Sequence, residues 1–144
     1  MATVIRGDDN FDTSAPSLGR VARTAGNITT TSTSLVDVTG TSLTLTTGAN
    51  PVAYGAVHTI SHSSSGGDVW LNIDIDGSLQ LGTGGMKLAE PIGNYPFNGS
   101  FSGQSASLSA GSHTIKEKWK VNSDTGTIWA NGSEAFLFYA REVK

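Results

Sequence analysis

The sequence predicts an all-β protein, an antiparallel jelly-roll-like β-sandwich of about eight or nine strands, and three observations support this fold class. Apolar and polar residues alternate in several short stretches, which is the period of a half-buried strand. Turn-forming residues separate these stretches at close intervals, and no segment shows a credible helical period. The 144 residues include 18 glycines and no cysteine, so stability must come from packing or from assembly.

The sandwich is expected to occupy residues 28–144, beginning with strands on either side of Gly40. The stretches SLVDVTG and TSLTLTT flank this glycine and carry leucines at alternating positions. A turn at GAN then leads into PVAYGAVHTIS, which is the next expected strand.

The stretch DVWLNIDIDG gives the clearest alternation. It places Val69 and three further aliphatic residues on one face, and Trp70 with polar residues on the other. Asp76 and Gly77 then predict a hairpin to a short strand that contains Leu79 and Leu81.

The last third of the chain predicts three more strands. In SHTIKEKWKV, Ile115, Trp119 and Val121 face inward while the lysines face outward. The stretch TGTIWANGSEAFLFYAREV is expected to form two strands joined by a type I′ turn at Asn131-Gly132, because both turn positions need a positive φ.

Two segments are predicted to lie outside the strands. Residues 82–105 are rich in glycine and contain two prolines, so they are expected to form a long loop. Residues 1–27 show no sustained period and are interrupted by Pro16, Gly19 and Gly26, which predicts an extended N-terminal arm.

Composition excludes several classes of function. The net charge of −3 and pI near 5.4 give no electrostatic basis for nucleic-acid binding. No stretch approaches the ~20 apolar residues of a membrane helix, so we expect no membrane insertion, and the N-terminus has no signal-peptide pattern. Charged residues make up 15% of the chain, below the ~25% of ordinary soluble domains, which fits a hydroxyl-rich β surface.

No constellation of residues predicts catalysis, a metal site or a cofactor. The chain lacks G-x-S-x-G, and Glu90 and Glu117 qualify as a glycosidase pair by residue type alone. Calcium binding by the aspartates is less expected than simple solvation, and the histidines are expected at the surface or an interface. These two sets are Asp68, Asp74 and Asp76, and His58, His62 and His113.

Aromatic residues suggest two kinds of contact. The stretch AFLFYA is apolar on both faces, so it is central in a sheet or covered by another subunit, and we favour coverage by symmetry mates. The predicted subunit-interface residues are Trp129, Phe136, Phe138 and Tyr139. A glycan platform is the less favoured alternative for a second set, Trp70, Tyr95 and Phe97.

The opening VIRGDDNFDTS resembles the N-terminal segment of virion proteins of tailed bacteriophages, where variants of GDDNFDT begin tail fibres and other small structural proteins. TTTSTSLVDVTGTSLTLTTGANPV resembles the first strands of their jelly-roll modules, and DIDG suits the hairpin of that module. Together these similarities cover about a third of the chain.

The resemblance implies a non-enzymatic virion component, made in the host cytoplasm and trimeric in many relatives, whose arm docks on a viral scaffold. In the favoured interpretation it is a capsid decoration (cement) protein that contacts the major capsid protein on the outer surface of the shell. The alternative is a tail fibre or tail appendage that binds a host-surface glycan. The predicted anchoring residues are Ile5, Arg6, Asp8, Asp9, Phe11 and Asp12.

Overall fold

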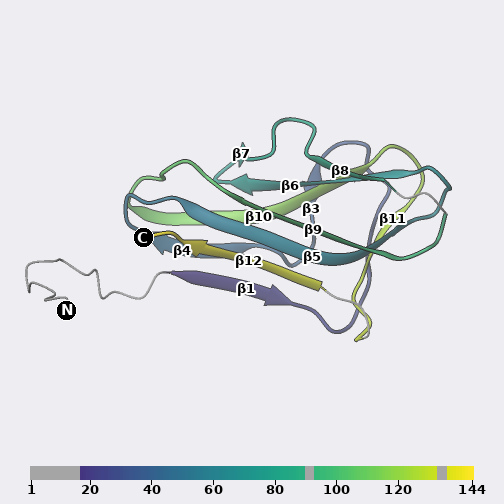
Figure 1. Ribbon diagram of the computed structural model, residues 1–144, viewed down its shortest axis with the longest axis horizontal. Coiled ribbons are helices and arrows are strands. Elements are labelled where there is room, and N and C mark those ends of the chain that lie inside the picture. The colour runs from purple at the N-terminus through teal and green to yellow at the C-terminus, as the bar shows by residue number, and fades with distance from the viewer. Residues whose placement is uncertain (1–16, 90–92, 133–135) are drawn as a thin grey trace, which may run out of the picture.

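The computed structural model describes residues 17–89, 93–132 and 136–144, and in these ranges every regular element is a β-strand. Two antiparallel sheets pack face to face as a sandwich (Figure 1), which confirms the predicted fold class. No helix that could cross a membrane occurs among the described residues.

The first sheet, sheet A, holds the first and last strands of the described chain. The long strand β5 runs through it, with β9 along one side and β11 and β12 along the other. The six strands of sheet A are β1 (Leu18–Ala22), β2 (Ile28–Thr30), β5 (Val52–His62), β9 (Phe97–Gln104), β11 (Gly126–Trp129) and β12 (Phe136–Glu142).

The second sheet, sheet B, is built around β10 and β6, which pair over seven residues. Its six strands are β3 (Val36–Asp37), β4 (Leu43–Thr47), β6 (Asp68–Ile75), β7 (Ser78–Leu79), β8 (Met86–Ala89) and β10 (Gly111–Val121).

Strands β11 and β12 do not form the hairpin predicted at Asn131-Gly132. Both pair with β5, β11 along residues 59–62 and β12 along residues 52–58, so they follow one another on the same side of that strand. Gly132 has a φ of 88°, but Asn131 is not in the left-handed region that a type I′ turn requires. The hairpin prediction is wrong because both segments find their backbone partners in β5.

In sheet B, too, two short consecutive strands pair with one longer strand, and this occurs twice. Strands β3 and β4 both pair with β10, and residues 38–42 loop out between them. Strands β7 and β8 both pair with β6. The hairpin predicted from β6 to β7 is confirmed, since Asp76 and Gly77 have φ values of 51° and 88°.

The sandwich begins earlier than the sequence predicted. All five residues of β1 pair with β12, so residues 17–22 belong to sheet A and not to an arm that ends at residue 27. The strand β1 lies at the edge of the sheet and pairs with β12 through backbone hydrogen bonds. Such pairing does not require the alternation of side chains by which strands are recognised in a sequence. The absence of a side chain at Gly19 leaves room for Leu43 and Leu45 of β4, because a Cβ at Gly19 would lie 3.2 Å from their side chains.

The predicted long loop 82–105 contains two strands, β8 and β9. Glycines occupy alternate inward positions of β9, and side chains of neighbouring strands fill the space beside them. A Cβ at Gly99 would lie 2.8 Å from Leu88, and one at Gly103 would lie 2.7 Å from the Tyr54 hydroxyl. Glycine is unfavourable in strands by propensity, but here close packing requires it.

The core lies between the sheets. The aliphatic face of β6 and the inward residues of β10 are buried as predicted. The largest fully buried side chains are Trp119, Phe138, Ile60, Leu71, Ile73, Ile115, Ile128, His58, His62, Glu117 and Val38.

Candidate functional site

A tryptophan between two lysines marks the outer face of sheet B. Trp70 on β6 lies opposite Lys87 on β8 and opposite Lys120 on β10, so the three side chains form one row across three strands. The Nζ atoms lie 5.7 Å (Lys87) and 5.2 Å (Lys120) from the centroid of the indole ring. These distances are within the range of cation–π attraction.

The lysines of this face differ in their ionic partners. Lys118 and Lys116 both donate to the carboxylate of Asp37, at 2.5 and 3.0 Å. These hydrogen bonds, that of Lys118 first, hold the pKa of Asp37 below its ordinary value. Lys87 pairs with Asp68 at 2.7 Å. Lys120, in contrast, has no carboxylate partner in the described part of the chain.

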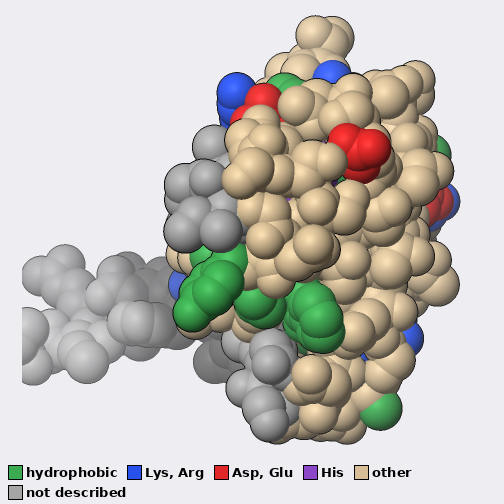
Figure 2. All heavy atoms as spheres, turned by 90° about the vertical axis from the view of Figure 1, so that its right-hand side faces the viewer, with side chains coloured by type: hydrophobic (Ala, Val, Ile, Leu, Met, Phe, Trp, Pro, Cys, Tyr) green, Lys and Arg blue, Asp and Glu red, His purple; other side chains and the backbone are tan. Residues whose placement is uncertain are grey.

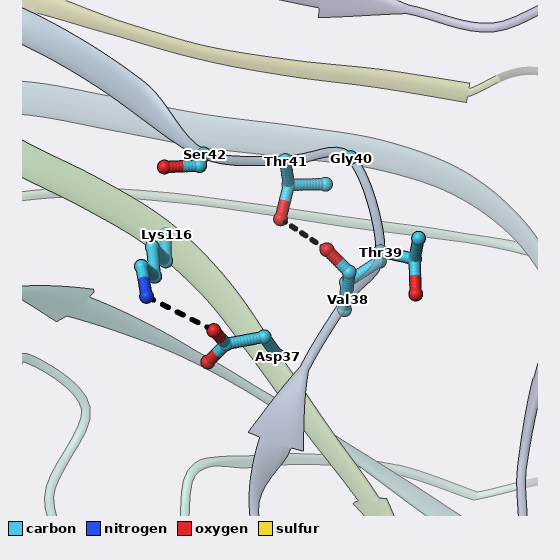
Figure 3. Close-up of a pocket in the computed structure, with 7 residues that line it drawn as sticks. All are labelled: Asp37, Val38, Thr39, Gly40, Thr41, Ser42 and Lys116. Atoms are coloured by element: carbon cyan, nitrogen blue, oxygen red, sulfur yellow. Dashed lines mark hydrogen bonds and ion pairs between the residues drawn. The ribbon is translucent and has the colours of Figure 1, made fainter.

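A hollow of about 290 Å³ lies beside Lys116, where residues 38–42 loop out between β3 and β4 (Figure 3). The Thr41 hydroxyl donates to the carbonyl of Val38 at 2.8 Å and stabilises the loop. Among the described residues that line the hollow, Asp37 is the one carboxylate. The lining residues are Asp37, Val38, Thr39, Gly40, Thr41, Ser42 and Lys116.

The aromatic residues predicted as a glycan platform have different environments. Trp70 is partly exposed on the outer face of sheet B. Tyr95 is 70% exposed in the segment that precedes β9. Phe97 is partly buried, because it occupies an inward position of β9 and packs against the core. Of these three aromatic residues, Trp70 is therefore the one whose neighbouring lysines could bind a charged ligand.

The outer face of sheet A mixes apolar and aromatic side chains with hydroxyl and amide side chains. Tyr139 lies across Gly55, where a Cβ would be 2.6 Å from the tyrosine hydroxyl. Trp129 is partly exposed and donates from Nε1 to the Ser61 hydroxyl at 2.8 Å. Leu18, at the edge of this face, is 67% exposed.

Charged residues are scarce on this outer face. Among its described residues only Arg20 and Arg141 carry a charge, and the others are apolar, hydroxyl-bearing, amide or glycine residues. An end of the sandwich also exposes groups of hydrophobic side chains with few charges between them (Figure 2). The outer face of sheet A thus has the low charge and the aromatic content that are typical of the centre of a protein interface.

Two of the four predicted interface residues are buried in the core of a single copy of the chain. Phe136 and Phe138 are 4% and 0% exposed, because β12 turns its even-numbered side chains toward the core. They have no exposed surface to offer a second subunit, which corrects that assignment. Trp129 and Tyr139 lie on the outer face, where they are accessible to a second subunit, so their role in an interface stays a prediction.

The histidines and acidic residues form separate contacts. Asp76 accepts from His113 Nδ1 at 2.6 Å, and this hydrogen bond raises the pKa of His113 and lowers that of Asp76. His58 contacts Glu117 in the core. The prediction that the histidines lie at the surface or an interface is wrong, because all three are buried and find hydrogen-bond partners within the chain. The described residues bring together no group of three metal-ligating side chains.

The position of Glu117 was missed in the sequence, although a signal was present. In KEKWK the glutamate has the same parity as Ile115 and Trp119, which places it on the inward face of β10. Glu90, the other carboxylate of the considered glycosidase pair, lies outside the described residues. So do all the predicted anchoring residues, Ile5, Arg6, Asp8, Asp9, Phe11 and Asp12.

Similar structures identify the fold. No protein-family model matches the chain, and no curated protein matches it. A chain of infectious bursal disease virus, Gx strain, superposes with a TM-score of 0.55 at 11% identity, covering 90% of this chain and 32% of the viral one. The present chain thus spans about a third of that viral chain. Eiger TNF from S. frugiperda superposes with a TM-score of 0.50 at 12% identity, covering 90% of this chain and 92% of the other.

A carbohydrate-binding module from Cellvibrio mixtus lichenase 5A, in complex with cellotriose, superposes with a TM-score of only 0.42 at 16% identity. That similarity is too low to carry weight. The chain is an antiparallel jelly-roll-like β-sandwich, and at these identities the similarity establishes the fold alone.

Proposed function

We propose that the chain is a non-enzymatic structural protein of a tailed-bacteriophage virion, a capsid decoration protein that assembles as a homotrimer through the outer face of sheet A. The observation that carries the proposal is the scarcity of charge on that face, together with the partly exposed aromatic side chains of Trp129 and Tyr139 and the exposed Leu18. The arm is proposed to dock on the major capsid protein, with the sandwich displayed on the outer surface of the shell.

A second copy of the chain is the partner that this face fits best. Tyr139, Trp129 and Leu18 supply apolar area, and aromatic residues are enriched in the centres of protein interfaces while most charges are depleted. Arg20 and Arg141 are the charges that an assembly must accommodate, and Arg141 lies opposite Leu18 at the edge of the sheet. Hydroxyl and amide side chains elsewhere on the face can exchange hydrogen bonds with a copy.

The arm supplies the second part of the proposal. Its sequence, with three aspartates around Phe11, supports docking in which carboxylates meet basic or amide groups and apolar side chains insert between subunits. Such a segment pays roughly 1–2 kcal/mol per residue in backbone entropy when it becomes ordered, so several contacts must form together.

Co-sedimentation with undecorated phage shells tests this function. The full chain is compared with a variant carrying Asp8→Asn, Asp9→Asn and Phe11→Ala, and both are first shown to have the same oligomeric state by sedimentation velocity. We expect the full chain to saturate the shells at shell-wide stoichiometry and the variant to stay in the supernatant. Equal binding of both proteins would exclude the arm as the anchor, and binding by neither would exclude a decoration role.

A tail appendage that binds a host-surface glycan is the second candidate function. The partly exposed Trp70 on the outer face of sheet B favours it, because exposed tryptophan rings are suited to stacking on sugars. This face lies opposite the proposed assembly face, so one trimer could present it outward. Copy number per virion separates the two functions, since decoration needs hundreds of copies and a tail part only a few.

A further inference from the structure

We propose that the outer face of sheet B binds an acidic polysaccharide, with a sugar ring stacked on Trp70 and its carboxylate paired with Lys120. This inference names the ligand class for the second candidate function and rests on it. The proposed site consists of Trp70, Lys120, Lys87 and the lysines that continue along β10.

The first argument is the position of the indole. Trp70 occupies an outward position on β6, whereas Trp119 is buried in the core. Its immediate cross-strand neighbours are Lys87 and Lys120, whose side chains are flexible and can move aside for a ligand. An aromatic plane with movable cations at its borders fits a ring that is apolar on its face and anionic at its edge.

The second argument is the missing counter-ion. Three lysines of this face have a carboxylate partner, but the described residues provide none for Lys120, whose ammonium lies over the indole of Trp70. The chain as a whole carries a net charge of −3, yet at this position a cation without a carboxylate partner lies beside a partly exposed aromatic ring. Charge complementarity therefore favours a ligand with a negative group at this end of the face.

The third argument concerns the extent of the site. Lys116, Lys118 and Lys120 share the outward face of β10, and alternate residues of a strand recur about every 7 Å. The row begins at Lys120, which lies opposite Trp70, and ends at Lys116. Lys116 also lines the hollow (Figure 3). Asp37, which accepts from both further lysines, is itself 46% exposed, so the carboxylates of a ligand can compete for them. A row of this kind fits a polymer better than a single sugar.

The test is titration of the full chain with an oligogalacturonate at low salt, by calorimetry and by tryptophan fluorescence. A neutral cello-oligosaccharide of the same length is the control ligand. We expect saturable binding of the acidic sugar and at least about tenfold weaker binding of the neutral one. Trp70→Ala should weaken binding at least about tenfold, and Lys120→Gln should weaken it and reduce its salt dependence. The control variant is Lys144→Gln, which changes a lysine two residues beyond the end of β12 in sheet A and should bind normally.

Several outcomes would overturn the proposal. These are no binding of the oligogalacturonate, equal binding of the neutral sugar, and binding that survives Trp70→Ala. Should Trp70→Ala fail to fold by circular dichroism, Trp70→Tyr replaces it, with loss of the ligand-dependent fluorescence change as the readout. Sedimentation velocity on the same samples reports trimer assembly separately, and copy number per virion tests the tail-appendage function without any sugar, so failure of sugar binding is distinguishable from failure of either proposed function.

Discussion

His58 on β5 and Glu117 on β10 meet across the core and connect the two sheets. The imidazole Nε2 lies 2.8 Å from each carboxylate oxygen, and neither side chain is exposed to solvent. The ring of Phe136 lies 4.6 Å from that of His58, and within the described structure His58 Nδ1 has no hydrogen-bond partner. The polar contact thus lies in an apolar environment, where burying either side chain without the other would be strongly unfavourable.

Removing one partner of this contact should destabilise the fold strongly. Glu117→Leu is expected to lower the free energy of unfolding by about 3–5 kcal/mol, because it leaves the imidazole buried without a partner. The double variant His58→Leu/Glu117→Leu should recover at least half of this loss, since two apolar side chains can pack together there. Urea unfolding at one fixed protein concentration measures both.

The single variant His58→Leu completes the double-mutant cycle. If the two single losses simply add in the double variant, His58 and Glu117 are not energetically coupled and the prediction fails.

The contact between His113 and Asp76 predicts a pH-dependent contribution to stability. Hydrogen bonding to Asp76 raises the pKa of His113 above 6.5, so this contribution is present below that pH and is lost as pH rises through the folded-state pKa. The pKa of Asp76 is lowered below 3.8, so its contribution is lost as pH falls through that lower value. The contact should therefore stabilise most between about pH 4 and pH 6.5.

Thermal unfolding of the Asp76→Asn variant measures this dependence. The difference in Tm from the unmodified chain should be larger at about pH 5.5 than at about pH 8.5. Asp37→Asn is the matched control, because Asp37 pairs with lysines that stay charged over this range, and its effect should be equal at the two pH values. An equal effect for Asp76→Asn would contradict the prediction.

Gly55→Ala should weaken assembly more than folding. The new methyl group would meet the Tyr139 ring, 2.6 Å from its hydroxyl, and push this partly exposed side chain out of the outer face of sheet A. We expect the dissociation constant of the oligomer to rise at least about tenfold in sedimentation velocity. An unchanged constant would show that Tyr139 does not take part in the assembly.

Gly103→Ala is the corresponding change on the inner side of the same sheet. Its methyl group would lie 2.7 Å from the hydroxyl of Tyr54, which is only 2% exposed and cannot move into solvent. Overpacking of this kind typically costs about 1–3 kcal/mol, which urea unfolding should detect. A loss below the error of the measurement would mean that the interior around Tyr54 can rearrange.

Sequence patterns predicted those parts of the fold that depend on alternation. Val69 and Ile115 lie inward in strands whose inward positions are mostly apolar and whose outward positions are mostly polar, so the two-residue period shows directly in the sequence. The turn at Asp76-Gly77 was also predictable, since both residues adopt the positive φ that their side chains tolerate.

Features that depend on a third strand could not be predicted in this way. Asn131-Gly132 has the composition of a tight turn, but both flanking segments pair with β5, which lies far away in the sequence. The inward glycines of β9 likewise reflect the volumes of Tyr54 and Leu88, which belong to other strands. Local propensity contains no information about either relationship.

The candidate binding site was predictable in part. Trp70 was identified from its place opposite the aliphatic face of β6. Its neighbours Lys87 and Lys120 depend on the register of three strands, which the sequence does not specify locally.

The order of strands in the chain has a consequence for synthesis on the ribosome. Every strand of sheet B has been translated once residue 121 is made, whereas sheet A also needs β11 and β12, which end at Glu142. Until these emerge, β1 has no backbone partner and the outer face that holds Tyr139 does not exist. The association that we propose through that face therefore requires a chain that has already completed its own sandwich, and neighbouring nascent chains on one messenger RNA do not yet present it.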